Sequence, residues 1–130
     1  MRKGVLKEEN IFIKEKKDNI SRSCTIQLCS GDNILASAEI RTAGDTWVFQ
    51  KISVAEEHRA KGYGSEVLKK LVGYLDRNQI DLYAYIHSSG SLSEQQLAAW
   101  YKRHGFVDSD ERGYQLVRKS RQNLVVNEQL

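Results

Sequence analysis

The sequence predicts an α/β (α+β) domain in which helices flank a mixed β-sheet. In the first half of the chain, apolar and polar residues alternate with the period of two that is typical of β-strands. From Ser65 onward, apolar residues recur at helical spacing, and a short run with strand character follows over residues 81–86. A strand, a helix and a strand in this order indicate a right-handed crossover that joins two parallel strands.

The size and composition of the chain favour one domain. Its 130 residues, 40% of them hydrophobic, can bury one core of ordinary size. No proline and no Gly/Ser-rich stretch marks an internal linker. We therefore expect a single domain over residues 1–119, followed by a weakly patterned C-terminal tail over 120–130 that frays.

Short antiparallel strands are expected before the first helix. The expected strands cover residues 11–14, 25–28, 34–41 and 47–54, with turns at 30–33 and 43–45. The segment from Trp47 to Val54 is apolar on both faces, which favours a place at the centre of the sheet. Cys24 and Cys29 point to opposite faces of one strand, so we expect two reduced thiols rather than a disulfide.

The first helix is expected over residues 65–77. Its apolar side consists of Val67, Leu68, Leu71, Val72 and Leu75. After it, the strand over 81–86 carries Leu82, Ala84 and Ile86 on one face. Two final strands are expected over 106–107 and 114–117, around a turn at 108–113.

The second helix shows signals for both of its ends. It begins at one of two capping boxes, Ser91 with Glu94 or Ser93 with Gln96. Gly105 follows two basic residues and matches a C-terminal stop. The inward stripe of this helix is expected to contain Leu97, Trp100, Tyr101 and His104.

A glycine-rich loop lies between the expected central strand and the first helix. Its residues 58–64 are His-Arg-Ala-Lys-Gly-Tyr-Gly. Glycine at alternate positions lets the backbone turn tightly with its N–H groups pointing into one concavity, beside the positive end of the helix dipole. Arg59 and Lys61 add full positive charges, so the loop suits a pyrophosphate. The alternative is that Gly62 and Gly64 only shape a solvated loop.

Two other phosphate-binding motifs do not fit this loop. The dinucleotide fingerprint G-x-G-x-x-G fails because position 67 is Val and because seven residues separate Val54 from Gly62. The nucleotide P-loop requires a lysine after its last glycine, whereas Gly64 is followed directly by Ser65 and Glu66.

Two segments resemble motifs of one protein family. Ile52-Ser53-Val54 followed by Arg59-Ala60-Lys61-Gly62-Tyr63-Gly64 resembles motif A of the GCN5-related N-acetyltransferase (GNAT) family, R/Q-x-x-G-x-G/A after a central strand. Residues 97–106 are similar to motif B of the family, in which a tyrosine stands five residues before the phenylalanine of a Gly-Phe pair. The two motifs and the strand between them cover residues 46–117.

The resemblance implies the GNAT acyl-CoA N-acyltransferase fold, with a sheet that is splayed at its centre. It also implies acetyl-CoA as the co-substrate, bound between the strands 47–54 and 81–86, with no metal. The pantetheine arm would pair with strand backbone, and the pyrophosphate would bind N–H groups at the helix start. The implied cofactor-binding residues are Ile52, Ser53, Val54, Arg59, Ala60, Lys61, Gly62, Tyr63, Gly64 and Ser65.

Acetyl transfer to an amine needs a proton for the departing thiolate and a base for the amine. Tyr101 is the candidate general acid, and the alternative is a core aromatic packed beside Trp100. The expected central strand carries no acid at 46–50. His87 is the candidate base because the ordinary pKa of histidine lies near neutrality, and the alternative is a loop-end histidine without a role. Glu94 lies where relatives carry a cofactor-binding asparagine, so helix capping is its expected role.

The resemblance also bears on the acceptor site. Relatives usually insert two helices between the first and second strands, where this chain has only a short, mostly polar segment between Phe12 and Ile26. These helices are therefore expected to be shortened or missing. The site for the acceptor, a small-molecule or peptide amine, must then be open, or completed by a second copy of the chain in a homodimer or by the C-terminal tail.

We therefore expect an N-acetyltransferase in which a primary amine attacks acetyl-CoA directly, and the alternative is a non-catalytic or regulatory CoA-binding module. A nucleic-acid binder is disfavoured because Lys and Arg outnumber Asp and Glu by only 20 to 17. No long apolar run indicates a membrane span or a signal segment, so we expect a cytoplasmic protein. No metal site is expected, because His58, His87 and His104 lie far apart and lack ligand spacing.

Overall fold

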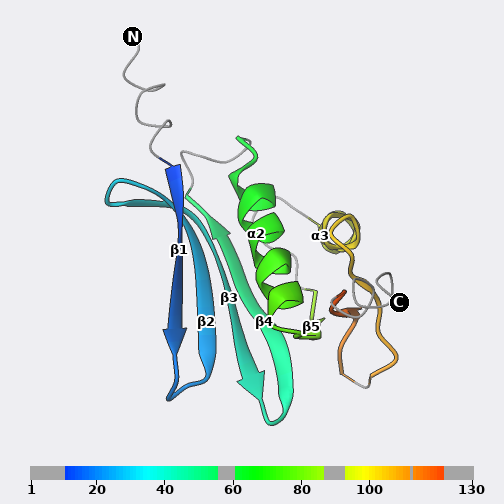
Figure 1. Cartoon of the computed structure of the whole chain (residues 1–130). Helices are drawn as coiled ribbons and strands as arrows, with labels where there is room; N and C mark the ends of the chain where they lie inside the picture. The colour runs from blue at the N-terminus through cyan, green and yellow to red at the C-terminus, as the bar shows by residue number, and fades with distance from the viewer. Residues whose placement is uncertain (1–10, 56–60, 87–92, 112, 122–130) are drawn as a thin grey trace, which may run out of the picture. The chain divides into compact units, whose positions relative to one another are not determined.

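The first half of the chain forms β-strands, and in the second half helices alternate with strands (Figure 1). This computed structural model describes residues 11–55, 61–86, 93–111 and 113–121. In chain order, its elements are β1 (Ile11–Asp18), β2 (Ser23–Ser30), β3 (Asn33–Ala43), β4 (Thr46–Val54), α2 (Tyr63–Arg77), β5 (Leu82–Ala84), α3 (Glu94–Lys102), β6 (Val107–Asp108) and β7 (Leu116–Arg118).

The strands form a mixed sheet in the order β1-β2-β3-β4-β5-β7-β6. β1 with β2 and β2 with β3 pair in antiparallel fashion, whereas β4 and β5 are parallel. β7 is antiparallel to both of its neighbours, β5 and β6. The predicted mixed sheet is therefore confirmed, with β4 at its centre and with α2 connecting the two parallel strands.

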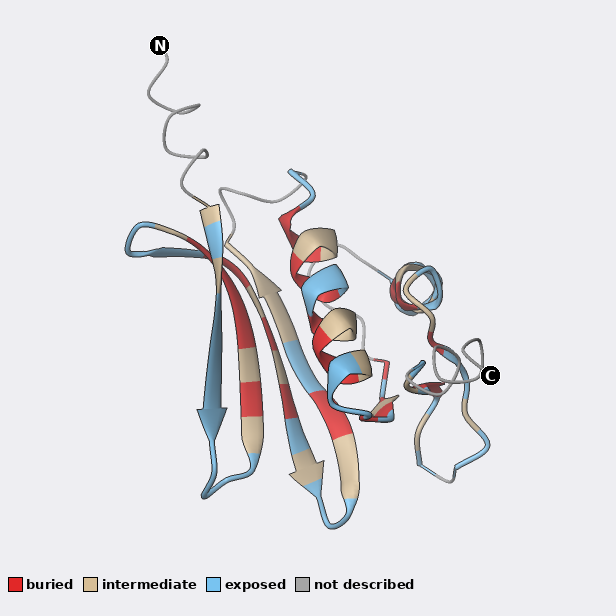
Figure 2. Cartoon of the chain, in the orientation of Figure 1, coloured by how far each residue is buried: buried red, intermediate tan, exposed pale blue. Residues whose placement is uncertain are grey.

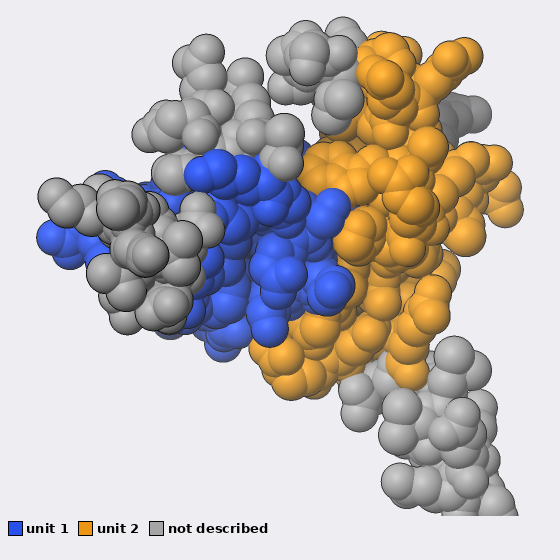
Figure 3. Space-filling model, turned by 90° about the horizontal axis from the view of Figure 1, so that it is seen from above, with its two compact units in different colours: residues 1–41, 50–71 blue, residues 42–49, 72–130 orange. Residues whose placement is uncertain are grey.

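The chain divides into two compact units (Figure 3). The first contains residues 1–41 and 50–71, and the second contains residues 42–49 and 72–130. The division falls inside β4 and α2, so neither unit is a separate stretch of the chain. The expectation of one domain over residues 1–119 stays a prediction.

In the first unit, β1 leads into β2 through a short turn. The carboxylate of Asp18 accepts hydrogen bonds from the backbone N–H groups of Ile20 and Ser21, at 3.0 and 3.3 Å. This side-chain contact stabilises the turn as an Asx-type structure. The hairpin that follows pairs Asp18 with Ser23 and continues to the pair of Ile11 with Ser30. No helix separates β1 from β2, as expected from the short polar segment between them.

The core of the first unit follows from the alternation in its strands and the helical stripe in α2. Figure 2 shows the buried positions as red bands along β2, β3 and α2. The most deeply buried of them are Cys24, Ile26, Leu28, Leu35, Ala36, Ala38, Ile40, Val67, Leu68 and Leu71. Both cysteines are buried thiols outside any disulfide, and a β-bulge between Leu28 and Cys29 shifts the pairing of β2 with β3. Neither described helix combines the length and apolar composition that crossing a membrane requires.

In the second unit, α3 begins at the capping box of Ser93 and Gln96. The Ser93 hydroxyl accepts from the Gln96 N–H at 3.1 Å, and the Gln96 side chain accepts from the Ser93 N–H at 2.8 Å. The other predicted box involves Ser91, which lies outside the described residues. The helix ends at Lys102, and the predicted stop, Gly105, has φ +98°.

The strands of the second unit differ from their predicted bounds. β5 covers only Leu82–Ala84 because the Ile86 N–H donates to the side chain of Gln115, while the Gln115 N–H donates to the Ala84 carbonyl. β6 and β7 begin one and two residues later than predicted, at Val107 and Leu116. Tyr114, predicted to lie in the last strand, instead closes a turn through its N–H and the Glu111 carbonyl.

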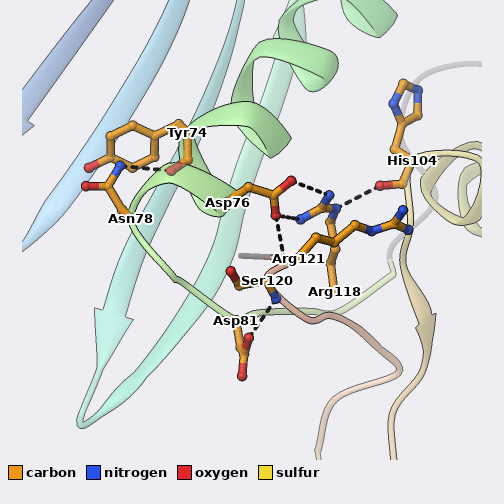
Figure 4. Close-up of polar contacts among 8 residues, drawn as sticks. All are labelled: Tyr74, Asp76, Asn78, Asp81, His104, Arg118, Ser120 and Arg121. Atoms are coloured by element: carbon orange, nitrogen blue, oxygen red, sulfur yellow. Dashed lines mark hydrogen bonds and ion pairs between the residues drawn. The ribbon is translucent and has the colours of Figure 1, made fainter. Parts of the chain in front are cut away.

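An ion pair of Arg118 with Asp76 joins the end of α2 to β7 (Figure 4). Arg118 is only 4% exposed, and its guanidinium donates to both carboxylate oxygens of Asp76, at 2.8 and 3.1 Å. Its Nε donates to the His104 carbonyl at 2.9 Å, which ties the turn after α3 to the same group. The pair is therefore bidentate, and the third guanidinium nitrogen is also satisfied.

The carboxylates of Asp76 and Asp81 hold the first residues of the predicted tail. The Arg121 N–H donates to Asp76 at 3.0 Å, and the Ser120 N–H donates to Asp81 at 2.8 Å. Residues 122–130 lie outside the described residues, so fraying of the tail over 120–130 stays a prediction. Burial acts to raise the pKa of Asp76, but hydrogen bonds from Arg118 and Arg121 and their positive charges leave it below its usual value of 3.8.

We predict that Asp76→Asn lowers the free energy of unfolding at pH 7 by roughly 3 kcal/mol, because it leaves a buried guanidinium without its counter-charge. Because the folded-state pKa of Asp76 is lowered, this stabilisation is complete above about pH 4 and is lost as the pH falls through the lowered pKa. Urea unfolding of wild type and variant at pH 7 and in acid measures both effects.

Asp108→Asn is the matched control. Asp108 is 82% exposed and lies 3.1 Å from the Lys102 ammonium, so removing its charge is expected to cost less than about 1 kcal/mol. Equal losses for the two variants at pH 7 would contradict a structural role of the Asp76–Arg118 pair.

Candidate active site

The end of β4, residue 61 and the start of α2 form the described part of the predicted loop region. Ile52, Ser53 and Val54 are each half-buried, and the next N–H, that of Ala55, donates to the Leu35 carbonyl at 3.0 Å. All of these residues belong to the first unit. The backbone of β4 therefore ends in strand geometry directly before the loop.

The helix after the loop begins at Tyr63, two residues before the predicted start at Ser65. Gly62 has φ +83°, a left-handed conformation that glycine adopts without the penalty of a Cβ. Its carbonyl accepts the hydrogen bond of the Glu66 N–H at 3.0 Å, so the helical ladder starts at Gly62. The helix starts earlier than predicted because Gly62, in its left-handed conformation, reverses the chain direction so that the next residue, Tyr63, is already helical.

The surface of the loop is open at its glycine. Lys61 and Gly62 are exposed, Ser65 is half-buried, and Tyr63 and Gly64 are buried. A Cβ on Gly62 would meet no atom within 4 Å. Helix geometry concentrates partial positive charge at the first turn, and the Lys61 ammonium adds to it. The junction therefore suits an anion that approaches the backbone closely.

Several predicted residues lie outside the described residues. They are His58, Arg59 and Ala60 of the loop, and His87, the candidate base. Their predicted roles stay predictions. Glu94 is the first residue of α3 and is exposed, while the helix cap itself is formed by Ser93 and Gln96.

β4 and β5 pair over a short distance only. Their parallel ladder consists, among the described residues, of Trp47 with Leu82 and Val48 with Tyr83. β4 continues to Val54. After β5, the Ile86 N–H donates its hydrogen bond to the side-chain oxygen of Gln115. Pairing that stops after the first residues of both strands is the feature expected of a centrally splayed sheet.

Tyr101 lies on the buried side of α3 in the second unit. Its side chain is 8% exposed, and its ring centroid lies 5.5 Å from that of Phe49 and 5.6 Å from that of Phe106. Burial raises the pKa of Tyr101 above its usual value of 10.0, so the phenol keeps its proton at neutral pH. This is the state that a general acid needs, and the same packing also satisfies the alternative of a core aromatic.

The predicted inward stripe of α3 is narrower than expected. Leu97 and Tyr101 are buried, whereas Trp100 and His104 are only half-buried. Trp100 lies at the flank of the stripe and lines a hollow of about 430 Å³ together with Gln96, Ala99 and Arg103. In this nine-residue helix, Leu97 and Tyr101 are four residues apart and define the buried face. Trp100 is three residues after Leu97, so it lies at the edge of that face.

Sequence reasoning missed a cluster of three tyrosines in the second unit. Tyr83 and Tyr85 follow the alternation of their segment, but Tyr114 is distant in sequence and meets them only through the fold. The sequence does show that Tyr83 and Tyr85 alternate with Leu82 and Ala84, which indicates that the two tyrosines share one face of the segment. The described residues hold no group of three or more His, Cys, Asp or Glu side chains placed to bind a metal ion.

Comparison with known proteins gives one family and one fold. The family model of an acetyltransferase (GNAT) domain matches residues 9–108. A GNAT family acetyltransferase from Elizabethkingia anophelis with acetyl-CoA bound has a TM-score of 0.63 and 16% identity, over 85% of this chain and 99% of its own. No curated protein sequence matches the chain.

Two further solved structures share the fold. IAA acetyltransferase from Bacillus cereus ATCC 14579 has a TM-score of 0.62 and 17% identity, over 84% of this chain and 99% of its own. PaiA N-acetyltransferase from Thermoplasma acidophilum in complex with coenzyme A has a TM-score of 0.58 and 15% identity, over 75% of this chain and 61% of its own. At these identities the similarity establishes the fold, as predicted.

Proposed function

Because the chain belongs to the GNAT acetyltransferase family, we propose that it transfers the acetyl group of acetyl-CoA to a primary amine. The junction of β4, Gly62 and α2 carries the proposal, since it joins a strand end to an anion-binding helix start. Two of the similar structures hold acetyl-CoA or coenzyme A, which supports the same ligand here.

The cofactor is proposed to bind mainly through backbone. Ile52, Ser53 and Val54 would pair with the pantetheine arm as with an added strand. The N–H groups from Lys61 to Ser65 would hold the pyrophosphate, with Gly62, Tyr63 and Gly64 between them. Arg59 and Ala60 complete the proposed loop, and Arg59 and Lys61 would balance phosphate charge.

Tyr101 is proposed as the general acid. Attack of the amine on the thioester carbonyl forms a C–N bond and breaks the C–S bond, which leaves a thiolate that needs a proton. The Tyr101 phenol, kept neutral by burial, would give that proton to the thiolate. Transfer from a phenol of pKa about 10 to a thiolate of pKa about 8.5 is uphill, so close positioning must supply the advantage.

The amine must lose a proton before it can attack. An alkyl ammonium of pKa about 10.4 is only roughly one part in a thousand neutral near pH 7. His87 is proposed to take this proton, directly or through water. The acceptor is a small-molecule or peptide amine, and we propose that a second copy of the chain or the C-terminal tail completes its site if that site is not simply open.

A second candidate function is a CoA-binding or regulatory module without turnover. Two observations favour it: β4 carries no carboxylate, and β1 runs straight into β2 where relatives insert helices. The module would share the cofactor loop with the enzyme but would not depend on the hydroxyl of Tyr101. The dependence of turnover on the Tyr101 hydroxyl therefore separates the two functions.

Gly62→Asp is expected to weaken acetyl-CoA binding at least about tenfold, because it sets a carboxylate against the pyrophosphate. Calorimetric titration with acetyl-CoA measures the loss. Gly31→Asp is the control, since Gly31 also has a positive φ, +60°, and open space around its Cβ position, but lies in the turn between β2 and β3. Wild-type affinity in Gly62→Asp would refute the loop assignment, as would no binding by the wild type.

Tyr101→Phe is expected to keep acetyl-CoA affinity and to lower the rate of amine acetylation by about a hundredfold, because it removes only the phenolic hydroxyl that carries the acidic proton. Release of free thiol in the presence of amines measures the rate, and calorimetry measures the affinity. Tyr74→Phe, which removes the hydroxyl of another buried tyrosine, is the control for a general loss of packing. An unchanged rate in Tyr101→Phe would assign Tyr101 to the core alone.

A further inference from the structure

β2 lies between β1 and β3 and gives the sheet of the first unit two different faces (Figure 1). On the core face, Cys24, Ile26 and Leu28 pair with buried residues of β3. The apolar stripe of α2, the one helix described in this unit, is buried and needs this apolar face. On the opposite side, which we call the outer face, the odd-numbered residues of β2 pair with residues of β1 and β3 that are exposed or half-buried.

Gln27 lies at the centre of the outer face and is the most buried polar side chain on it. It pairs across the strands with the exposed Lys14 and the half-buried Ser37, yet Gln27 itself is only 8% exposed. Within the described part of the chain, no group hydrogen-bonds to its side-chain amide. A buried amide without a hydrogen bond costs free energy, and an identical amide can satisfy it because the group both donates and accepts. The centre of the outer face therefore favours contact with a copy of itself.

The residues at the two ends of each row across the outer face are complementary. A row consists of one residue each from β1, β2 and β3 that pair across the strands, so its ends lie on β1 and β3. The ends of three rows are Phe12 with Ile34, Lys16 with Glu39, and Asp18 with Arg41. Two rows therefore carry opposite charges at their ends, with the cation on β1 in one row and on β3 in the next. The ends of the apolar row, Phe12 and Ile34, are 44% and 49% exposed.

The ends of a row do not satisfy each other within one chain. β1 and β3 are two strand spacings apart, which is about 10 Å. Among the described residues, no ion pair joins Lys16 to Glu39 or Asp18 to Arg41. The charges and the apolar ends are therefore available to a partner with the reverse arrangement, and a second copy of the same face has that arrangement.

We propose that the outer face is the interface of a homodimer whose two-fold axis runs along β2, between the two copies. Such an axis places β1 of each copy over β3 of the other, so every row meets the same row of the partner with its ends exchanged. Lys16 then faces the partner subunit's Glu39, and the apolar ends meet in the same way. In the next row, Asp18 faces the partner subunit's Arg41. Gln27 lies on the axis, where it meets the partner subunit's Gln27 and the two amides can hydrogen-bond reciprocally.

Charge disfavours the other simple two-fold arrangement of two such faces. An axis that runs across the strands at Gln27 would lay β1 over β1 of the partner. Lys14 would then face the partner subunit's Lys14, and Lys16 would face the partner subunit's Phe12. The axis along β2 avoids both contacts and keeps the strands nearly aligned, as in sheets that pack face to face. Three strands of this length cover only roughly 14 by 25 Å, so we expect a micromolar dissociation constant.

Sedimentation of the full chain, from micromolar to submillimolar concentration, measures the dimer. Lys16→Glu is expected to raise the dissociation constant at least about tenfold, because it sets carboxylates against each other in two symmetric contacts. The double variant Lys16→Glu/Glu39→Lys exchanges the charges and is expected to restore the wild-type constant. Lys70→Glu makes the same charge change at an exposed position of α2 and serves as the matched control.

Mixing two single variants tests the direction of the axis. Lys16→Glu has carboxylates at both ends of its row and Glu39→Lys has ammonium groups at both, so each variant alone is expected to dimerise weakly. Their equimolar mixture is expected to form a heterodimer at least about tenfold tighter than either variant alone, because both contacts become complementary. A mixture of Lys70→Glu with Glu39→Lys has the same net charges and is expected to form no preferred heterodimer.

Three outcomes would overturn the proposed interface. The first is a wild type that stays monomeric at the highest concentration, and the second is a dimer that Lys16→Glu leaves unchanged. The third is a mixture of Lys16→Glu with Glu39→Lys that dimerises no better than its components. None of them bears on acetyl transfer, because the inference does not rest on the proposed function.

Discussion

The short ladder between β4 and β5 is the constraint on which the proposed site depends. Among the described residues, two pairs, ending at Val48 with Tyr83, join the strands at their first residues. Beyond this point the chain after β5 is held on its other side by Gln115. Backbone polar groups of a strand need partners, and an extended ligand can supply them as an added strand would. The early end of the ladder therefore supports the proposal that a pantetheine arm pairs with β4.

Local chemistry at the start of α2 favours an anion. The start of α2 combines a helix dipole, the exposed backbone of Gly62 and the ammonium of Lys61, which favour a negatively charged phosphate. The net charge of the chain is only +3, so this preference comes from the local arrangement of these groups and not from the charge of the whole protein.

Local patterns predicted most of the fold, whereas contacts between distant residues escaped them. Period-two alternation, the helical stripe of α2 and the Ser93 capping box are properties of neighbouring residues. The early end of β5 depends on the side chain of Gln115, and the ion pair of Arg118 with Asp76 joins residues 42 positions apart. The tyrosine cluster likewise requires β7 to lie beside β5. No pattern within one segment contains that information.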